Sequence, residues 1–364
     1  DVERSRGLGD VYKRQGYGWW SHDIGGHHQG YRDDDLYLRW IEFAVFQPIL
    51  RLHSTAIELL GKEPWKYRQD VYHSACDWLR FRHRLIPYIF SMNHRCHKDG
   101  IVLCEPMYYS YPNDKNAYDF PNQYMFGSEL IVCPITSPQN KENGMGSVNA
   151  WIPDGEYTDI FTLQKYKGSQ VLTLNRELYS IPVLAKAGAV IPLSCDKGNS
   201  VSNPEMLEVW VFKGNNKFVM YEDNGKTDFE NHTAETVFTN EYNSVDNSVK
   251  LTIEVQGDTS VIPKNRQYKI CFKDIDCEDF VVDYSDEPIV IEISNPMPYK
   301  KEELRDRVIT IMSRWQDSTF KKQRAYKPFE NVTDKNSLFS VLHSSKLPKP
   351  VFNMIYEALS GCYD

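Results

Sequence analysis

Two polar side chains near the start of the chain follow short extended segments and could contact one ligand. Asp23 follows the aromatic segment 17–22, Tyr-Gly-Trp-Trp-Ser-His, and precedes Ile-Gly-Gly, whose glycines let a backbone turn closely around a ligand. His53 lies near the end of the apolar segment 49–54, Ile-Leu-Arg-Leu-His-Ser. A carboxylate that accepts hydrogen bonds beside an imidazole that can donate one suits neighbouring hydroxyl groups, such as those of a sugar. On these residues alone, the alternative that Asp23 caps a turn and His53 is a hydrogen-bonded core histidine stays open.

The elements that would position these two side chains alternate between strand and helix. We expect strands at 17–22 and 49–54 and helices at 36–46 and about 70–97, where Pro87 either kinks the second helix or begins a new turn. This order implies parallel βα units. In a (β/α)₈ barrel, functional side chains lie at the C-terminal ends of the strands, so the carboxylate and the imidazole would point into one pocket.

After residue 100 the pattern changes to short strand-like segments separated by turn residues. Residues 101–195 predict an antiparallel β-sandwich, and 196–299 predict a second β module with a two-residue hairpin turn at Asn224-Gly225. Residues 300–364 predict a helical tail. Residues 1–15 show neither helical nor strand periodicity, and we interpret them as a non-native leader.

Composition and charge restrict the class of protein. The net charge is −8, with 50 acidic against 42 basic residues, which argues against a nucleic-acid partner. No apolar segment approaches the roughly 18 residues that span a bilayer, so no membrane partner is expected. Eight cysteines without CxxC spacing predict free thiols in a reducing compartment, hence a cytoplasmic location. Because the native start is missing under this interpretation, a signal peptide stays possible.

A metal site is the weaker interpretation of the histidine-rich segment. His22, Asp23, His27 and His28 invite a zinc site, yet neither an HExxH motif nor paired His/Cys ligand spacing supports one. We therefore predict no metal ion and no cofactor.

Seven segments resemble, in the same order, segments of bacterial enzymes of glycoside hydrolase family 31, the α-glucosidase and α-xylosidase family. They are WWSHDIGG (19–26), RLHS (51–54), FRHRLIPYIF (81–90), QYMFGSELIVCPI (123–135), WIPDGEYTDIF (151–161), IPVLAKAGAVIPL (181–193) and FVMYEDNGKTDF (218–229). The resemblance implies an α/β plus all-β fold. Residues 16–100 would be the C-terminal end of a (β/α)₈ TIM barrel, with strands and helices seven and eight. Two β-sandwich domains, proximal (101–195) and distal (196–299), would follow, and then the helical tail (300–364).

The same resemblance assigns roles to particular residues. It implies that Asp23 and His53 line the subsite for the non-reducing-end sugar. His27 stands where the family usually has phenylalanine, which leaves the sugar preference open, and Trp20 either approaches the same pocket or packs inside the barrel. The family is retaining and uses two aspartates, both upstream of the HDIGG segment, so we assign no catalytic residue in this chain.

These observations predict a fragment of an exo-acting α-glucosidase that acts on an oligosaccharide or α-glucoside and is inactive by itself. An α-xylosidase of the same family is the alternative within that class, because the residues that frame carbon six would lie largely upstream. A non-catalytic carbohydrate-binding β-sandwich protein is the alternative of another class. The oligomeric state stays open.

Overall fold

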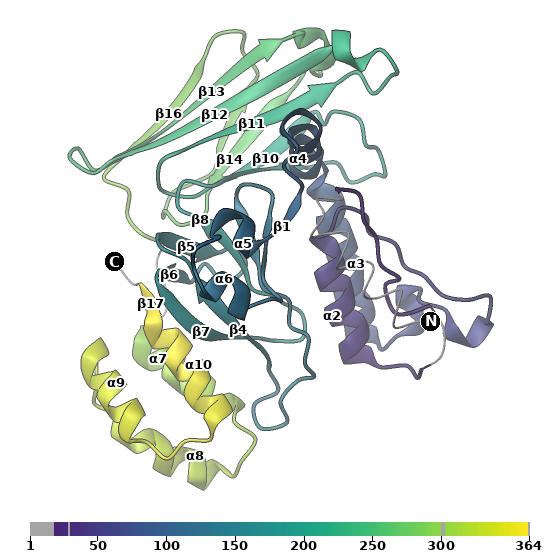
Figure 1. Ribbon diagram of the computed structural model, residues 1–364. Helices are drawn as coiled ribbons and strands as arrows, with labels where there is room; N and C mark the ends of the chain where they lie inside the picture. The colour runs from purple at the N-terminus through teal and green to yellow at the C-terminus, as the bar shows by residue number, and fades with distance from the viewer. Residues whose placement is uncertain (1–17, 28–29, 300–302, 363–364) are drawn as a thin grey trace.

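The computed structural model describes residues 18–27, 30–299 and 303–362 (Figure 1). Its first part is helical, and the bounds are α2 (Asp34–Val45), the 3₁₀ turns η1 (Glu58–Leu60) and η2 (Pro64–Lys66), α3 (Gln69–Arg84) and α4 (Ile86–Asp99). The Asp33 carboxylate accepts a hydrogen bond from Leu36 N at 3.0 Å, which caps α2 at its N-terminus. The helix predicted at about 70–97 is two helices, because Pro87 lacks the N–H that a continuous helix needs.

The two predicted strands at 17–22 and 49–54 are wrong for the described residues, 18–22 and 49–54. The structure has one isolated parallel bridge near these segments, between Ile24 and Leu52. A strand needs a partner along its length, and a two-stranded pair is only marginally stable. The described residues therefore contain no closed barrel, although the predicted parallel direction is present at this bridge.

The first β region contains a sheet and a separate two-stranded ribbon. The sheet order is β1 (Cys104–Pro106), β2 (Tyr124–Phe126), β3 (Leu130–Val132), β8 (Val183–Lys186), β5 (Glu156–Asp159), β6 (Lys165–Lys167) and β17 (Gly361–Cys362). The ribbon pairs β4 (Gly146–Ile152) with β7 (Gln170–Arg176), and the short helices α5 (Met107–Ser110) and α6 (Asn116–Asp119) lie beside it. All these pairs are antiparallel, as predicted.

The second β region contains two four-stranded sheets. One has the order β15 (Phe280–Asp283), β14 (Gln267–Phe272), β10 (Met206–Val211) and β9 (Val190–Ser194). The other has the order β11 (Asn216–Asp223), β12 (Thr233–Asn243), β13 (Ser248–Gly257) and β16 (Ile289–Ser294). The two four-stranded sheets face each other (Figure 1). The rings of Phe238 on β12 and Tyr268 on β14 meet edge to face, with 6.3 Å between the ring centroids. Strand β9 lies before the domain boundary predicted at 195, and its partner β10 lies after that boundary. One sheet therefore contains strands from both sides of the predicted boundary.

The hairpin predicted at Asn224-Gly225 differs from the observed connection. β11 and β12 pair as an antiparallel hairpin, but residues 224–232 connect them and include the 3₁₀ turn η3 (Phe229–Asn231). The side chain of Asn224 donates to Asp228 at 3.0 Å, which holds this longer loop together. A second 3₁₀ turn, η4 (Thr259–Val261), follows β13.

The tail is helical, as predicted, and has its own core. Its elements are α7 (Leu304–Arg314), α8 (Thr319–Tyr326), η5 (Lys327–Phe329), α9 (Lys335–Ser344) and α10 (Lys349–Ser360). Apolar side chains from these elements cluster together, among them Val308, Trp315, Phe329, Leu342 and Ile355. The chain then adds β17 to the edge of the first sheet through β6.

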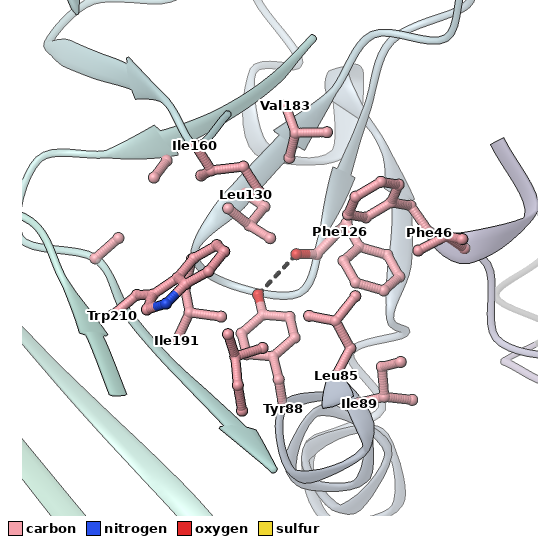
Figure 2. Packing of buried hydrophobic residues seen from close by; sticks show 14 of the residues in the cluster. Phe46, Leu85, Tyr88, Ile89, Phe126, Leu130, Ile160, Val183, Ile191 and Trp210 are labelled. Atoms are coloured by element: carbon pink, nitrogen blue, oxygen red, sulfur yellow. Dashed lines mark hydrogen bonds between the residues drawn. The ribbon is translucent and has the colours of Figure 1, made fainter. Parts of the chain in front are cut away.

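Helix α4 joins the helical part to both β regions (Figure 2). Tyr88 donates its hydroxyl to the Phe126 carbonyl at 2.7 Å and accepts a hydrogen bond from Glu129 N at 3.2 Å. Its ring also stacks on Phe218 of β11, with 5.7 Å between the ring centroids. One continuous apolar core therefore extends from α2 to β16.

Two further findings concern the apolar character of the helices and the state of the cysteines. Within the part of the chain that the structure describes, no helix combines the length and apolar character needed to cross a membrane. The cysteines whose side chains are described (76, 96, 104, 133, 195, 271 and 277) are reduced thiols, as predicted for these positions.

Candidate functional site

The single parallel bridge places Asp23 and His53 beside each other. His53 N donates to the Ile24 carbonyl at 3.3 Å, directly after the Ile24–Leu52 bridge. As a result, Asp23 Oδ2 lies 3.9 Å from His53 Nε2. The side chains of Asp23 and His53 are 39% and 28% exposed, so His53 is not a core histidine. The juxtaposition expected from two neighbouring parallel segments is therefore present.

His27 is the third member of the cluster. The backbone turns tightly after Asp23, since Gly26 N donates to the Asp23 carbonyl at 2.9 Å and both Gly25 and Gly26 adopt positive φ angles of 87° and 81°. This turn brings His27 Nδ1 within 2.6 Å of His53 Nε2. The two imidazole rings stack with 4.7 Å between centroids and 13° between planes. His27 therefore lies in one cluster with Asp23 and His53.

Arg51 belongs to the site and was not predicted from the sequence. Its Nη2 donates to Asp23 Oδ1 at 2.8 Å, which forms an ion pair on the outer side of the carboxylate. In an extended segment, residues two apart point to the same face, so the Arg-Leu-His spacing places Arg51 and His53 together. That alternation is the signal by which sequence reasoning could have found this arginine.

Trp20 contacts the neighbouring His22. Its ring lies 5.3 Å from the ring of His22. His22 in turn accepts a hydrogen bond from Trp40 Nε1 at 2.8 Å and stacks on Phe43, both of α2. These contacts direct His22 toward α2, and the ring of Trp20 lies beside that of His22.

The same contacts change the membership of the metal-binding group considered from the sequence. His22 faces α2, and His28 lies outside the described residues. His53 takes their place, because ligand atoms of Asp23, His27 and His53 all lie within 4.8 Å of one another. Two imidazoles and one carboxylate thus face a common, solvent-accessible space.

This arrangement suits binding more than bond cleavage. Its donors and acceptors can pair with adjacent hydroxyl groups of one small ligand, because a carboxylate accepts and an imidazole can donate. A retaining glycosidase needs two carboxyl groups about 5–5.5 Å apart, and Asp23 is the carboxylate that the described cluster provides.

A concave region lies away from this cluster. A cavity of about 1040 Å³ is bounded by the start of α4, the loop 200–204 and the loop between β11 and β12. It contains His232, whose Nδ1 lies 2.8 Å from Asp258 Oδ2 and whose Nε2 lies 3.8 Å from Asp228 Oδ2. This histidine provides a useful comparison for the cluster at Asp23.

Comparison with known proteins places these features in a family. A model described as "Glycosyl hydrolases family 31 TIM-barrel domain" matches residues 12–92, and one described as "Glycosyl hydrolase family 31 C-terminal domain" matches residues 100–191. The chain belongs to glycoside hydrolase family 31.

Individual relatives of this family 31 chain agree. An α-xylosidase of Saccharolobus solfataricus is 31% identical over 222 residues, which cover 58% of this chain and 29% of the relative. Alpha-glucosidase 2 of Bacillus thermoamyloliquefaciens is 26% identical over 208 residues, which cover 56% of this chain and 26% of the relative. The chain therefore spans less than a third of the length of either curated relative.

A solved structure shows the same fold. The family 31 dextranase of Flavobacterium johnsoniae, as a mutant complexed with isomaltotriose, superposes with a TM-score of 0.62 at 26% identity. The match covers 72% of this chain and 33% of that one. The matched region of this chain is thus the C-terminal part of a TIM-barrel domain followed by a β-rich domain.

Proposed function

We propose that this chain is part of a retaining, exo-acting glycoside hydrolase that removes terminal α-linked glucose from oligosaccharides. Two findings support the proposal: membership of family 31, and the cluster at the Ile24–Leu52 bridge. The observation that carries it is the approach of Asp23 Oδ2 to His53 Nε2 at 3.9 Å, because adjacent hydroxyls of one sugar ring can reach both groups.

In this proposal the chain supplies binding groups, and the catalytic carboxylates come from a part of the protein outside it. Asp23 would accept hydrogen bonds from ring hydroxyls while Arg51 holds its other oxygen. His53 would donate to a neighbouring hydroxyl, with its ring oriented by stacking on His27. Such contacts accelerate hydrolysis when they strengthen as the ring distorts toward its oxocarbenium-like transition state.

An α-xylosidase is the second candidate, and one observation favours it. The relative from Saccharolobus solfataricus that is 31% identical carries that name, against 26% for the α-glucosidase from Bacillus thermoamyloliquefaciens. Xylose lacks the hydroxymethyl group of glucose, so parallel assays on p-nitrophenyl α-glucoside and α-xyloside decide between the two. A non-catalytic carbohydrate-binding protein would bind sugars and release no nitrophenol from either.

The test uses the full-length protein with Asp23→Ala and His53→Ala. Removing a hydrogen-bonding partner of the bound sugar costs about 1–3 kcal/mol, more for a charge, so each substitution should lower kcat/KM by roughly ten- to several-hundred-fold. The matched control is His73→Ala, an exposed histidine on α3, which should leave kcat/KM unchanged. The 364-residue chain assayed alongside should release no nitrophenol.

A purely structural role for Asp23 and His53 predicts a different pair of results. The melting temperature of each variant would fall while kcat/KM of the folded fraction stayed near the parental value. Melting temperature and kinetics are therefore measured on the same preparation, and unchanged kcat/KM would remove both residues from the site.

A further inference from the structure

We propose that Asp23, His27 and His53 form a binding site for a divalent transition-metal ion such as Zn²⁺. The three side chains come from two segments that the parallel bridge holds together, and their ligand atoms converge within 4.8 Å. Two imidazole nitrogens and one carboxylate oxygen are the ligand set that zinc takes in three-residue sites, with the fourth position open. This inference depends on the cluster itself and not on the proposed glycosidase activity.

The distances between the ligand atoms fit one ion after small side-chain shifts. Two nitrogens that bind one zinc ion at about 2.0–2.1 Å in a tetrahedral arrangement lie about 3.3 Å apart. His27 Nδ1 and His53 Nε2 are 2.6 Å apart, and His53 Nε2 and Asp23 Oδ2 are 3.9 Å apart. The required separation lies between these two values, so rotation of two partly exposed side chains is enough.

The hydrogen bond between the imidazoles shows which atoms the ion would use. At 2.6 Å one of the two facing nitrogens must donate a proton to the other. A metal ion that takes the place of this proton binds the lone pairs of both facing nitrogens, and the proton moves to the other nitrogen of the donating ring. Each imidazole then binds the ion through one nitrogen and carries its hydrogen on the other, so the step involves no net proton release.

The carboxylate is oriented for the same purpose. Arg51 binds Asp23 Oδ1 at 2.8 Å, and Oδ2 faces His53. A ligating carboxylate whose other oxygen is hydrogen-bonded is the usual arrangement around protein metal sites, because the outer partner fixes the ligand's orientation. The exposure of the cluster leaves the fourth position to water.

The experiment is calorimetric titration of ZnCl₂ into the purified 364-residue chain, with His27→Gln and His53→Gln as test variants. His232→Gln is the matched control, because His232 also lies beside two carboxylates, Asp258 at 2.8 Å and Asp228 at 3.8 Å. Loss of an outer-shell partner already weakens metal binding 10–100-fold in typical sites, so loss of a ligand should weaken it by about tenfold or more. His232→Gln should bind as the parent does.

Cobalt distinguishes this site from the free cysteines. Co²⁺ bound by nitrogen and oxygen gives visible d–d bands without the near-ultraviolet sulfur-to-cobalt absorption that thiolate ligands cause. Parental affinity in both test variants, loss of binding in His232→Gln, or a sulfur-to-cobalt band would each overturn the proposal. His27 is exposed, so His27→Gln tests the site even where His53→Gln folds poorly.

If the proposed function holds, zinc and the sugar compete for this site. The same atoms would contact either the ion or the sugar, so saturating methyl α-glucoside should lower the zinc affinity of the full-length protein. Unchanged zinc affinity at a site that still requires His27 would count against the sugar-binding role of Asp23 and His53, and would leave the metal site standing.

Discussion

Glu42 lies on the inner face of α2 and is 1% exposed, with its Oε2 3.0 Å from Arg39 Nη1. Burial raises the pKa of the Glu42 carboxyl to about 8, and the opposing charge of Arg39 only partly offsets that effect. The guanidinium of Arg39 is shared, since it also donates to the carbonyls of Ser180 at 2.7 Å and Glu177 at 2.9 Å. Arg39 therefore connects α2 to the first β region by hydrogen bonds, in addition to pairing with the Glu42 carboxyl.

This pKa makes the stability of the chain depend on pH in a stated direction. The folded pKa of about 8 exceeds the ordinary value of 4.5, so the folded state binds the proton more tightly than the unfolded state. The contribution of Glu42 to the free energy of unfolding is fully present below about pH 4.5 and is lost as the pH rises to about 8.

We expect Glu42→Gln to remove that part of the pH dependence. Urea denaturation of both proteins at several pH values between 5 and 8 measures it. The control is Glu58→Gln, an exposed glutamate in η1, which should retain the parental slope. A parental slope in Glu42→Gln would show that the carboxyl is already ionised at pH 5.

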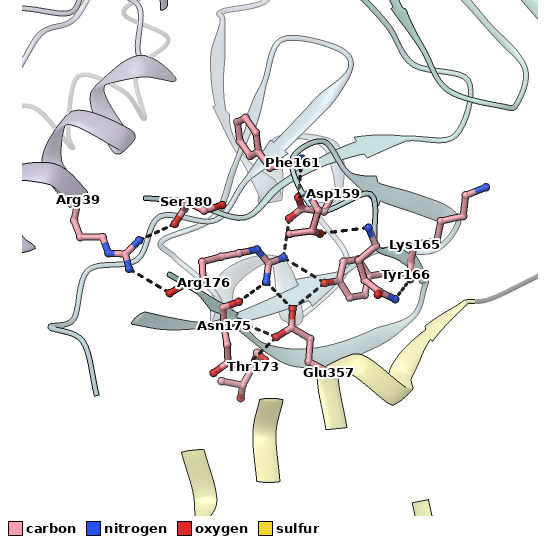
Figure 3. A network of polar contacts seen from close by, with 12 residues as sticks. Arg39, Asp159, Phe161, Lys165, Tyr166, Thr173, Asn175, Arg176, Ser180 and Glu357 are labelled. Atoms are coloured by element: carbon pink, nitrogen blue, oxygen red, sulfur yellow. Dashed lines mark hydrogen bonds and ion pairs between the residues drawn. The ribbon is translucent and has the colours of Figure 1, made fainter. Parts of the chain in front are cut away.

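Helix α10 docks the tail onto the first β region through Glu357 (Figure 3). Glu357 Oε1 accepts hydrogen bonds from Arg176 at 2.7 Å and from Tyr166 at 2.9 Å, and Oε2 accepts from Asn175 N at 2.8 Å. Arg176 also pairs with Asp159 at 2.7 Å. Burial would lower the pKa of Arg176, but the two carboxylates outweigh it and raise that pKa, so the network holds a charged arginine.

Removal of Glu357 should therefore destabilise the chain. Glu357→Ala leaves Arg176 and Asn175 buried with fewer partners, and breaking a buried ion pair from one side typically costs about 3–5 kcal/mol. Urea denaturation of Glu357→Ala against Glu303→Ala, an exposed glutamate before α7 in the same tail, measures the difference. Equal free energies of unfolding in the two variants would mean that the tail is not held by this network.

At the scale of the whole molecule, α4 is the element that the helical part and both β regions share. Ser91 accepts a hydrogen bond from Tyr221 N of β11 at 3.0 Å, and Tyr88 contacts Phe126 and Phe218. Helix α4 therefore packs between parts that the sequence assigns to separate domains. The apolar core around it is continuous, so we expect these parts to unfold together.

Hydrogen exchange tests this expectation. The amides of α4 (Ile86–Asp99) should be protected to a degree similar to those of β11 (Asn216–Asp223), since they share one core. Helix α8 (Thr319–Tyr326) has no buried residue and should exchange faster, which makes it the internal comparison. Exchange of α4 at the rate of α8 would mean that α4 opens independently of the sheets.

Local features of the sequence were sufficient to predict the helices and the change from helical to β structure along the chain. Asp33 caps α2 and Pro87 separates α3 from α4, because capping and the missing proline N–H act within one helical turn. The pair Asp23 and His53 was likewise predictable, since both end short segments of a recognisable motif order.

What only the tertiary structure decided depends on contacts between distant residues. The segments at 18–22 and 49–54 have strand-like sequences, yet a strand forms only where a neighbour supplies hydrogen bonds, and here that neighbour is one bridge. Arg51 enters the site because that bridge places it beside Asp23, and the contact of His27 with His53, which the sequence did not predict, depends on the turn at Gly25. Composition and periodicity describe one segment at a time, and the position of a side chain relative to another segment is set by packing and pairing across the fold.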